Sequence, residues 1–353
     1  MIMRKEISFE AILLEGGEFL PEVTVQYSTY GKLNRDGSNV IWVCHALTGD
    51  DQVHKWWKPI FGKGKFLDPD KYFIVCANVL GSCYGTTGPS SKILPRGYER
   101  RNFPVITIRD IVKVHERLAD FLGLEKIKTL IGPSLGGQQA LEWTLQDPDR
   151  FENVCVIAAN AKHSPWGIAF NESQRMAIWS DETFRSNFKN GGKYGLKAAR
   201  AAALLSYRSY DCYAATQNEE HDFKIDSYKA SSYQNYQGDK IVERFSPYSY
   251  WTLSKAMDSH NIGRDRGGIR HALSNLSTKL LTIGVSSDVL FPPNEQEEIA
   301  EYAQNGVFKK IDSIYGHDGF LIEGEQLNKI LIDLHEQKLR PTTYTKFKSN
   351  YLN

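Results

Sequence analysis

The segment Gly132-Pro133-Ser134-Leu135-Gly136-Gly137 constrains the fold most, because it places one serine between glycines where an apolar run meets a helical pattern. The run Lys128–Ile131 is short, apolar and partly β-branched, which predicts a buried parallel strand. Residues 138–145 then show helical spacing of apolar side chains. A sharp turn from strand to helix strains the intervening residue and needs glycines where a Cβ would clash. The segment therefore predicts a serine hydroxyl presented at a helix N-terminus.

Further short apolar runs predict the rest of a sheet. Parallel strands are expected at Val40–Cys44, Tyr72–Cys76, Val154–Ala158, Lys279–Ile283 and Phe308–Ile314, and helices at Thr107–Leu122, Asn294–Ala303 and Glu323–His335. Residues 6–29 alternate in polarity around Gly16-Gly17, which predicts an antiparallel opening pair. Strands that alternate with helices predict an α/β fold with a doubly wound, mostly parallel sheet, whose ligands bind at the carboxyl ends of the strands.

Residues 161–276 contain no such strand. They are polar, helical in places and rich in tryptophan and tyrosine. We interpret this segment as a helical cap inserted into a core formed by residues 1–160 and 277–353.

Charge and composition exclude several classes of partner. The 353 residues contain 43 Lys+Arg and 42 Asp+Glu, a net charge of +1, so neither nucleic acid nor an anionic membrane surface is expected to bind. No apolar stretch has the length of a membrane span, and the first residues lack the apolar core of a signal peptide, which predicts a cytoplasmic protein. Five cysteines without C-x-x-C spacing suggest neither disulfides nor zinc, and no metal is expected.

A serine nucleophile needs a histidine to take its proton and an acid to orient that histidine. Asp288 follows the strand at 279–283, and His317 follows the strand at 308–314. The order Ser134, Asp288, His317 is the chain order of an α/β-hydrolase triad. Asp312 and Asp318 compete with Asp288, but Asp312 is expected inside its strand and Asp318 directly follows the histidine.

Other histidines rank lower than His317 as the base. His115 and His335 fall in helical patterns and are expected to be exposed. His45 begins the loop His45–Gly49 and is expected to fix that loop rather than to react. The backbone N–H groups of Leu47 and Leu135 are the candidates for an oxyanion hole.

Several segments together resemble the homoserine O-acyltransferases of the MetX type, a branch of the α/β-hydrolase superfamily. The matching stretches are HALTG (45–49), NVLGSCYGTTGPSS (78–91), FPVITIRD (103–110), GPSLGG (132–137), ARAAALLSYRS (199–209), YSYWTLSKAMDSHNIGRDRGG (248–268) and GHDGFL (316–321). Serine esterases share only the elbow and the triad, so the matches in the cap favour a transferase.

The resemblance implies that an acyl group, acetyl above all, moves from acyl-CoA to the hydroxyl of L-homoserine through an acyl-serine, in methionine biosynthesis. It implies Ser134 as nucleophile, Asp288 and His317 as its partners, and Arg200 and Asp318 as ligands of homoserine. Tyr207, seven residues after Arg200, is expected on the same helical face of the pocket. No tightly bound cofactor is expected, and the resemblance implies a homodimer that forms through the cap.

The sequence departs from the family pattern beside the expected acyl-CoA channel. The family usually has glycine where this chain has Ser82 and glutamine where it has Tyr84. A succinyl donor, a serine acceptor, an esterase or thioesterase, and a catalytically silent member of the superfamily remain as alternatives.

Overall fold

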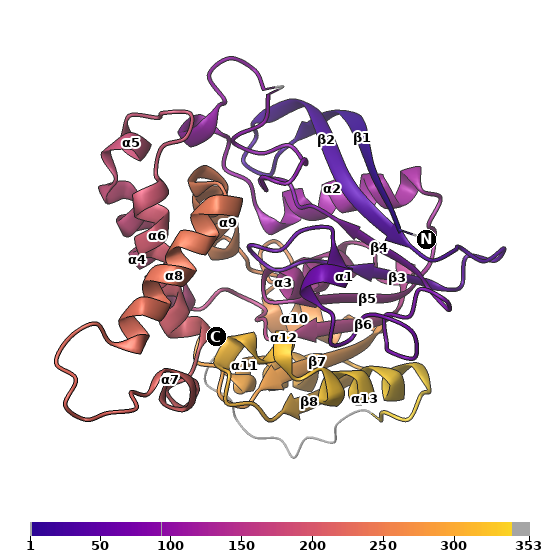
Figure 1. Cartoon of the computed structure of the whole chain (residues 1–353). Coiled ribbons are helices and arrows are strands. Elements are labelled where there is room, and N and C mark those ends of the chain that lie inside the picture. The colour runs from indigo at the N-terminus through magenta and orange to yellow at the C-terminus, as the bar shows by residue number, and fades with distance from the viewer. Residues whose placement is uncertain (1, 93, 341–353) are drawn as a thin grey trace.

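The computed structural model describes residues 2–92 and 94–340. Its centre is one sheet of eight strands in the order β1-β2-β4-β3-β5-β6-β7-β8 (Figure 1). The strands are β1 (Ile2–Leu13), β2 (Phe19–Tyr30), β3 (Val40–Val43), β4 (Phe73–Ala77), β5 (Ile127–Pro133), β6 (Phe151–Ile157), β7 (Lys279–Val285) and β8 (Gly306–Ile311). From β4 to β8 all neighbours pair in parallel. The doubly wound, mostly parallel sheet predicted from the sequence is therefore confirmed.

The first two strands form the antiparallel edge that the sequence predicts. β1 pairs with β2, and β2 pairs antiparallel with β4. Gly17 turns the chain between β1 and β2 with φ of +87°, a backbone angle that glycine adopts without strain. The alternating pattern of this segment thus reflects two strands at the rim of the sheet.

Helices cover both faces of the sheet. The helices of the described residues are α1 (Val53–Trp56), α2 (Ile108–Phe121), α3 (Leu135–Gln146), α4 (Pro165–Ser180), α5 (Glu182–Arg185), α6 (Lys193–Tyr207), α7 (Tyr210–Gln217), α8 (Lys229–Arg244), α9 (Pro247–Asp258), α10 (Ile269–Ser274), α11 (Pro293–Tyr302), α12 (Gly319–Ile322) and α13 (Gly324–His335), with short 3₁₀ turns at Arg100–Asn102, Pro148–Arg150 and Gly316–Asp318. Side chains of α2, α3 and α11 share one apolar core, and those of α1, α12 and α13 share the other. Strand β3 contributes to both, since Trp42 enters the first core and Ile41 the second.

The chain between β6 and β7 is helical from α4 to α10. Figure 1 shows α4, α5, α6 and α8 grouped beside the sheet rather than over one of its faces. Helix α6 packs on α4 and α8, so this group has contacts of its own. Residues 316–318 touch α6, and this contact joins the group to the carboxyl-end side of the sheet.

Local sequence signals explain where α2 begins. Thr107 accepts a hydrogen bond from the N–H of Asp110, while the Asp110 carboxylate accepts one from the N–H of Thr107, a reciprocal cap that stabilises the first turn. The observed ends lie within a few residues of those predicted for the strands and the longer helices. In the described ranges, 2–92 and 94–340, no helix is long and apolar enough to cross a membrane.

Candidate active site

Ser134 lies at the turn between β5 and α3, in a backbone conformation that L-residues rarely adopt. Its φ is 56° and its ψ is −125°. A Cβ added at Gly132 would lie 2.1 Å from the carbonyl oxygen of Gly136, and one at Gly136 would lie 2.1 Å from that of Cys44. These contacts are with backbone atoms that cannot give way, so both glycines are required by the turn. Strain of this kind is common where a side chain must be held for chemistry.

Three side chains form a hydrogen-bonded line at the carboxyl ends of the strands. The Nε2 atom of His317 lies 2.9 Å from Oγ of Ser134, and its Nδ1 atom lies 2.7 Å from Oδ2 of Asp288. A carboxylate only accepts, so Nδ1–H donates to Asp288 and Nε2 is left to accept from the serine hydroxyl. This is the arrangement in which histidine can remove the serine proton.

The loop after β7 holds Asp288 in place. Its second oxygen, Oδ1, accepts hydrogen bonds from the N–H groups of Leu290 (2.8 Å) and Phe291 (2.9 Å). The two rivals for its role lie elsewhere: Asp312 is exposed just past the end of β8, not inside the strand, and Asp318 pairs with Arg208. Asp288 is therefore the only one of the three that orients His317.

Electrostatics favour a protonated His317 more strongly than in water. Burial lowers the pKa of His317, but the charge and hydrogen bond of Asp288, together with the charge of Asp318, more than offset this and raise the pKa above its ordinary value. A second carboxyl, that of the partly buried Glu295, accepts a hydrogen bond from Asn160 at 3.2 Å. Burial raises the pKa of Glu295 to about 7, so near neutral pH it is partly uncharged and adds less repulsion to Asp288.

The loop after β3 lies against the start of α3. As the first residue of α3, Leu135 has an N–H with no acceptor inside the helix. Leu47 lies on the neighbouring loop, whose backbone touches Gly136 at Cys44. These two residues therefore lie where backbone donors can face the carbonyl that Ser134 would attack.

His45 holds this loop and takes no part in the line of three side chains. The N–H of Val79 donates to its Nε2 at 3.1 Å, so the other ring nitrogen carries the proton and donates to the Ala46 carbonyl at 2.8 Å. Both nitrogens are thus occupied. The expectation that His45 fixes the loop agrees with these contacts.

A cavity of about 180 Å³ opens over Ser134. It is lined by Ala46, Leu47, Thr48, Gly49, Trp56, Ser134, Arg200, Tyr207, Arg244, His317, Asp318, Phe320 and Leu321. Six of the eight site residues predicted from the sequence line it. The exceptions are Leu135 and Asp288, which lie behind Ser134 and His317.

Helix α6 brings a cation and an aromatic ring to this cavity. The Arg200 guanidinium lies 5.2 Å from the centre of the Tyr207 ring, as expected for side chains seven residues apart on one helical face. Asp318 also lines the cavity and forms an ion pair with Arg208, Nε to Oδ2, at 3.2 Å. The cavity therefore holds a serine, a guanidinium and a carboxylate within one enclosure.

Two arginines of the site were not singled out from the sequence. Arg208 lies at the end of α6, inside the same ARAAALLSYRS stretch as Arg200. The sequence therefore showed that Arg208 belongs to this stretch, but it did not show that Arg208 pairs with Asp318. Arg244 ends α8, and its guanidinium donates to the Thr48 carbonyl at 2.7 Å and to the Tyr84 hydroxyl at 2.8 Å. No local pattern marks Arg244, because both of its partners are distant in the chain.

The expected exposure of two histidines was wrong. His115 is 1% exposed, stacks on Trp143 and bonds to Gln139. His335 bonds to Thr129 and is largely enclosed, and burial lowers its pKa to about 4. Both lie on the side of their helices that faces the sheet, where each has a polar partner.

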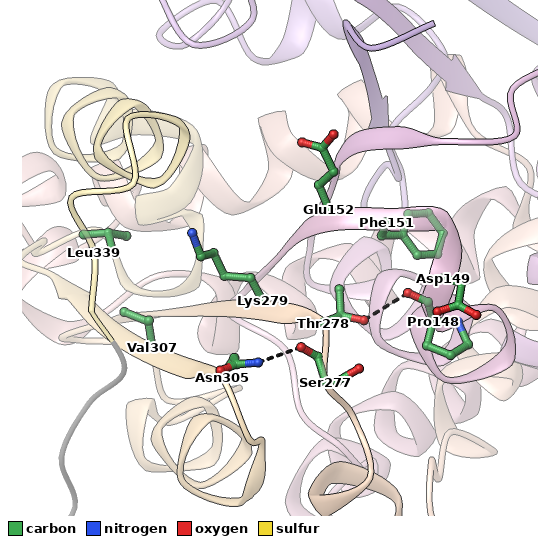
Figure 2. Close-up of a pocket in the computed structure, with 10 residues that line it drawn as sticks. All are labelled: Pro148, Asp149, Phe151, Glu152, Ser277, Thr278, Lys279, Asn305, Val307 and Leu339. Atoms are coloured by element: carbon green, nitrogen blue, oxygen red, sulfur yellow. Dashed lines mark hydrogen bonds between the residues drawn. The ribbon is translucent and has the colours of Figure 1, made fainter.

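A second pocket lies at the opposite edge of the sheet, by the first residues of β6 and β7 (Figure 2). Two hydrogen bonds cross between its walls: Thr278 to the Pro148 carbonyl (3.1 Å) and Asn305 to the Ser277 carbonyl (2.7 Å). In sheets of this type ligands bind at the carboxyl ends of strands. This pocket lies at the amino ends and is not the candidate site.

Comparison with known proteins agrees with the geometry. Residues 39–323 match the family model described as the alpha/beta hydrolase fold. The chain is 52% identical over 332 residues to a homoserine O-acetyltransferase of Cyclobacterium marinum, covering 93% of this chain and 94% of that one. The chain belongs to the homoserine O-acetyltransferase family. Because the match covers nearly the whole chain, the family includes the helices between β6 and β7 as well as the sheet.

Solved structures show that the fold alone does not separate homoserine O-acetyltransferases from esterases. A homoserine O-acetyltransferase from Staphylococcus aureus is 30% identical, with a TM-score of 0.79 and coverage of 99% of this chain and 98% of that one. Esterase E22 superposes with a TM-score of 0.84 at 21% identity, covering 94% of this chain and 100% of that one. Esterases and homoserine O-acetyltransferases thus share this fold, and side chains must distinguish them.

Proposed function

We propose that this protein transfers an acetyl group from acetyl-CoA to the hydroxyl of L-homoserine, a reaction of methionine biosynthesis. The observation that supports the proposal is the cavity over Ser134, whose lining also includes the guanidinium of Arg200 and the carboxylate of Asp318. An esterase acting with water needs neither group. An amino-acid acceptor offers a carboxylate and an ammonium, which Arg200 and Asp318 complement.

The first half-reaction uses the line of three side chains. His317 takes the hydroxyl proton while Ser134 Oγ attacks the thioester carbonyl carbon. The N–H groups of Leu47 and Leu135 stabilise the resulting oxyanion. When the C–S bond breaks, His317 returns the proton to the sulfur, and CoA leaves as a thiol. Asp288 stabilises the imidazolium that forms between these steps.

The second half-reaction replaces the thiol with homoserine. Arg200 holds the acceptor's carboxylate and Asp318 its ammonium, so that the side-chain hydroxyl points at the acetyl-serine. His317 takes the hydroxyl proton while the homoserine oxygen attacks the acetyl carbonyl carbon. The bond between that carbon and Oγ of Ser134 then breaks, and His317 returns the proton to Oγ. Asp318 can keep its ion pair with Arg208 and also accept hydrogen bonds from an ammonium, because a carboxylate has about four lone-pair positions.

The helices from residue 161 to 276 form a cap in this proposal, over a core made of 1–160 and 277–353. Helix α6 of this segment supplies both Arg200 and Tyr207. The cap also exposes large apolar side chains: Met176, Tyr194, Leu205, Tyr210, Phe223 and Ile225 are each at least 62% exposed. We attribute them to a contact with a second copy of this chain, which light scattering at several concentrations would detect as twice the chain mass.

Thiol release tests the function directly. Purified protein is given acetyl-CoA or succinyl-CoA, each with L-homoserine, with L-serine or with no acceptor. We expect repeated turnovers with acetyl-CoA only when homoserine is present, no more than one equivalent of thiol per chain without acceptor, and no release from Ser134→Ala. Repeated turnovers without any acceptor would establish a thioesterase instead, and no release from either donor would contradict acyl transfer.

A further inference from the structure

A groove rich in lysine and arginine adjoins the cavity over Ser134. Its volume is about 550 Å³, and it is lined by residues from 83–100, 189–193 and 242–248. Arg244 lines both this groove and the cavity, so the two meet at its side chain. The groove therefore leads outward from the nucleophile.

The cavity itself is too small for a whole acyl-CoA. Its volume of about 180 Å³ lies below the range of roughly 300–1,000 Å³ typical of sites for drug-sized ligands. CoA is larger than most such ligands. Only the acyl-thioester end can occupy the cavity, and the nucleotide end must lie beyond the rim.

The charge of the groove complements that nucleotide end. Five cationic side chains and two acidic ones line the groove: Lys92, Arg100, Lys189, Lys193 and Arg244 against Glu99 and Glu243. Glu99 already accepts from the N–H of Gly97 at 3.0 Å. CoA carries one negative charge on each phosphate of its diphosphate and about −2 on its 3′-phosphate. Phosphates attract clustered lysine and arginine, at contact and during diffusional approach.

Arg100 supplies a second, independent sign of a ligand. Its φ is 58°, a strained value for a residue with a Cβ. Its Nε atom is buried, and among residues 2–92 and 94–340 no hydrogen-bond partner meets it. A strained residue with an unused donor at a groove wall is typical of binding sites.

The groove walls are tied together. The N–H of Arg101 donates to Asn187 at 3.1 Å, and the Tyr248 hydroxyl donates to the Phe188 carbonyl at 2.6 Å. Lys189 directly follows Phe188 in the chain, and Lys193 is the first residue of α6. Both lysines are exposed, and neither forms an ion pair within the described part of the chain. Their ammonium groups are free to meet a phosphate.

We propose that this groove binds the diphosphate and 3′-phosphate of the acyl-CoA donor, with Lys189 and Lys193 among its ligands. The proposal rests on the proposed function for the identity of the donor. It places the pantetheine arm past Arg244, whose guanidinium is anchored to Thr48 and Tyr84. Tyr84, where the sequence departs from the family pattern, thereby helps to hold the passage between groove and cavity.

Binding in a Ser134→Ala background tests the groove, because acetyl-CoA then cannot acylate the protein. Titration calorimetry would compare three proteins: S134A, S134A with K189E/K193E, and S134A with K309E/K310E. The last pair reverses two equally exposed lysines on β8, far from the groove. Each protein is titrated with acetyl-CoA and with S-acetylpantetheine, which lacks the diphosphate and the 3′-phosphate of CoA.

We expect K189E/K193E to weaken acetyl-CoA binding at least tenfold, K309E/K310E to change it less than twofold, and S-acetylpantetheine to bind all three alike. Equal affinities of the K189E/K193E and K309E/K310E proteins for acetyl-CoA would overturn the proposal. Tight binding of S-acetylpantetheine, or no binding of acetyl-CoA to S134A, would overturn it too. Loss of lysine-dependent binding and loss of homoserine-dependent turnover are separate readouts, so the groove and the proposed function can fail independently.

Discussion

The Nε atom of Arg208 lies 3.2 Å from Oδ2 of Asp318, and this ion pair joins the end of α6 to the turn that follows β8. The carboxylate proposed to hold the ammonium of homoserine is therefore already paired before any substrate binds. Gly316, in the same turn, packs so closely on the backbone of Arg208 that a Cβ would lie 2.8 Å from it. The ion pair thus fixes the position of Asp318, which directly follows His317 and contributes its carboxylate to the cavity lining.

Replacing Arg208 tests this positioning. We expect Arg208→Gln to raise the KM for homoserine about tenfold, because Asp318 loses the partner that fixes its orientation. Acylation of Ser134 by acetyl-CoA should change little, since Arg208 does not line the cavity. Burst measurements of thiol release without acceptor, and steady-state rates with homoserine, separate the two effects. The exposed Arg35→Gln is the control, and an equal loss in both half-reactions would contradict the role.

The pH dependence follows from the environment of His317. Only the neutral imidazole can take a proton, so the acylation rate should rise with pH through the pKa of His317, which lies above its ordinary value of about 6.5. Asp288→Asn removes the charge that raises this pKa. We expect the acid limb to move to lower pH and the rate at its plateau to fall by about 10⁴.

Asp312→Asn provides the matched control for that profile. Asp312 is the rival carboxylate in the sequence, and it is exposed beyond the end of β8. Its replacement should leave both the plateau rate and the acid limb unchanged. A shift of the limb in Asp312→Asn, or none in Asp288→Asn, would contradict the assignment of the acid.

The sequence predicted the line of Ser134, Asp288 and His317 because each follows a strand of one parallel sheet. Strands of this kind are short apolar runs, and their carboxyl ends meet at one edge. The ion pair of Arg208 with Asp318 was not predictable in this way, since it depends on how α6 packs beside the sheet. Arg244 was missed for the same reason, because Thr48 and Tyr84 lie far from it in the chain.

Helical periodicity also misplaced two histidines. A polar residue in an amphipathic helix is expected on the solvent side, yet His115 is buried against Trp143. The pattern cannot show that Gln139, on another helix, supplies the hydrogen bond that makes burial acceptable. Local signals thus placed the elements well, and partners distant in the sequence decided the remaining side chains.

Gly136 tests how tightly α3 approaches the loop after β3. A Cβ there would meet the carbonyl oxygen of Cys44 at 2.1 Å, so Gly136→Ala must separate the loop from the helix. We expect a loss of about 3 kcal/mol in the free energy of unfolding. Gly16→Ala has open space around its Cβ and should change stability by less than about 0.5 kcal/mol. Similar urea midpoints for the two variants would argue against the close approach.

The strain at Ser134 predicts that two substitutions that both remove its hydroxyl differ in stability. Both Ser134→Ala and Ser134→Gly lose the hydroxyl, so neither should release CoA. Alanine keeps a Cβ at φ of 56°, whereas glycine adopts that angle freely. Relief of about 1–3 kcal/mol of strain exceeds the roughly 0.5–1 kcal/mol that glycine loses through its freer unfolded chain. Ser134→Gly should therefore be more stable than Ser134→Ala by about 1 kcal/mol in urea unfolding at equal slope. A less stable glycine variant would mean that the turn is not strained and that the packing around Ser134 decides its conformation.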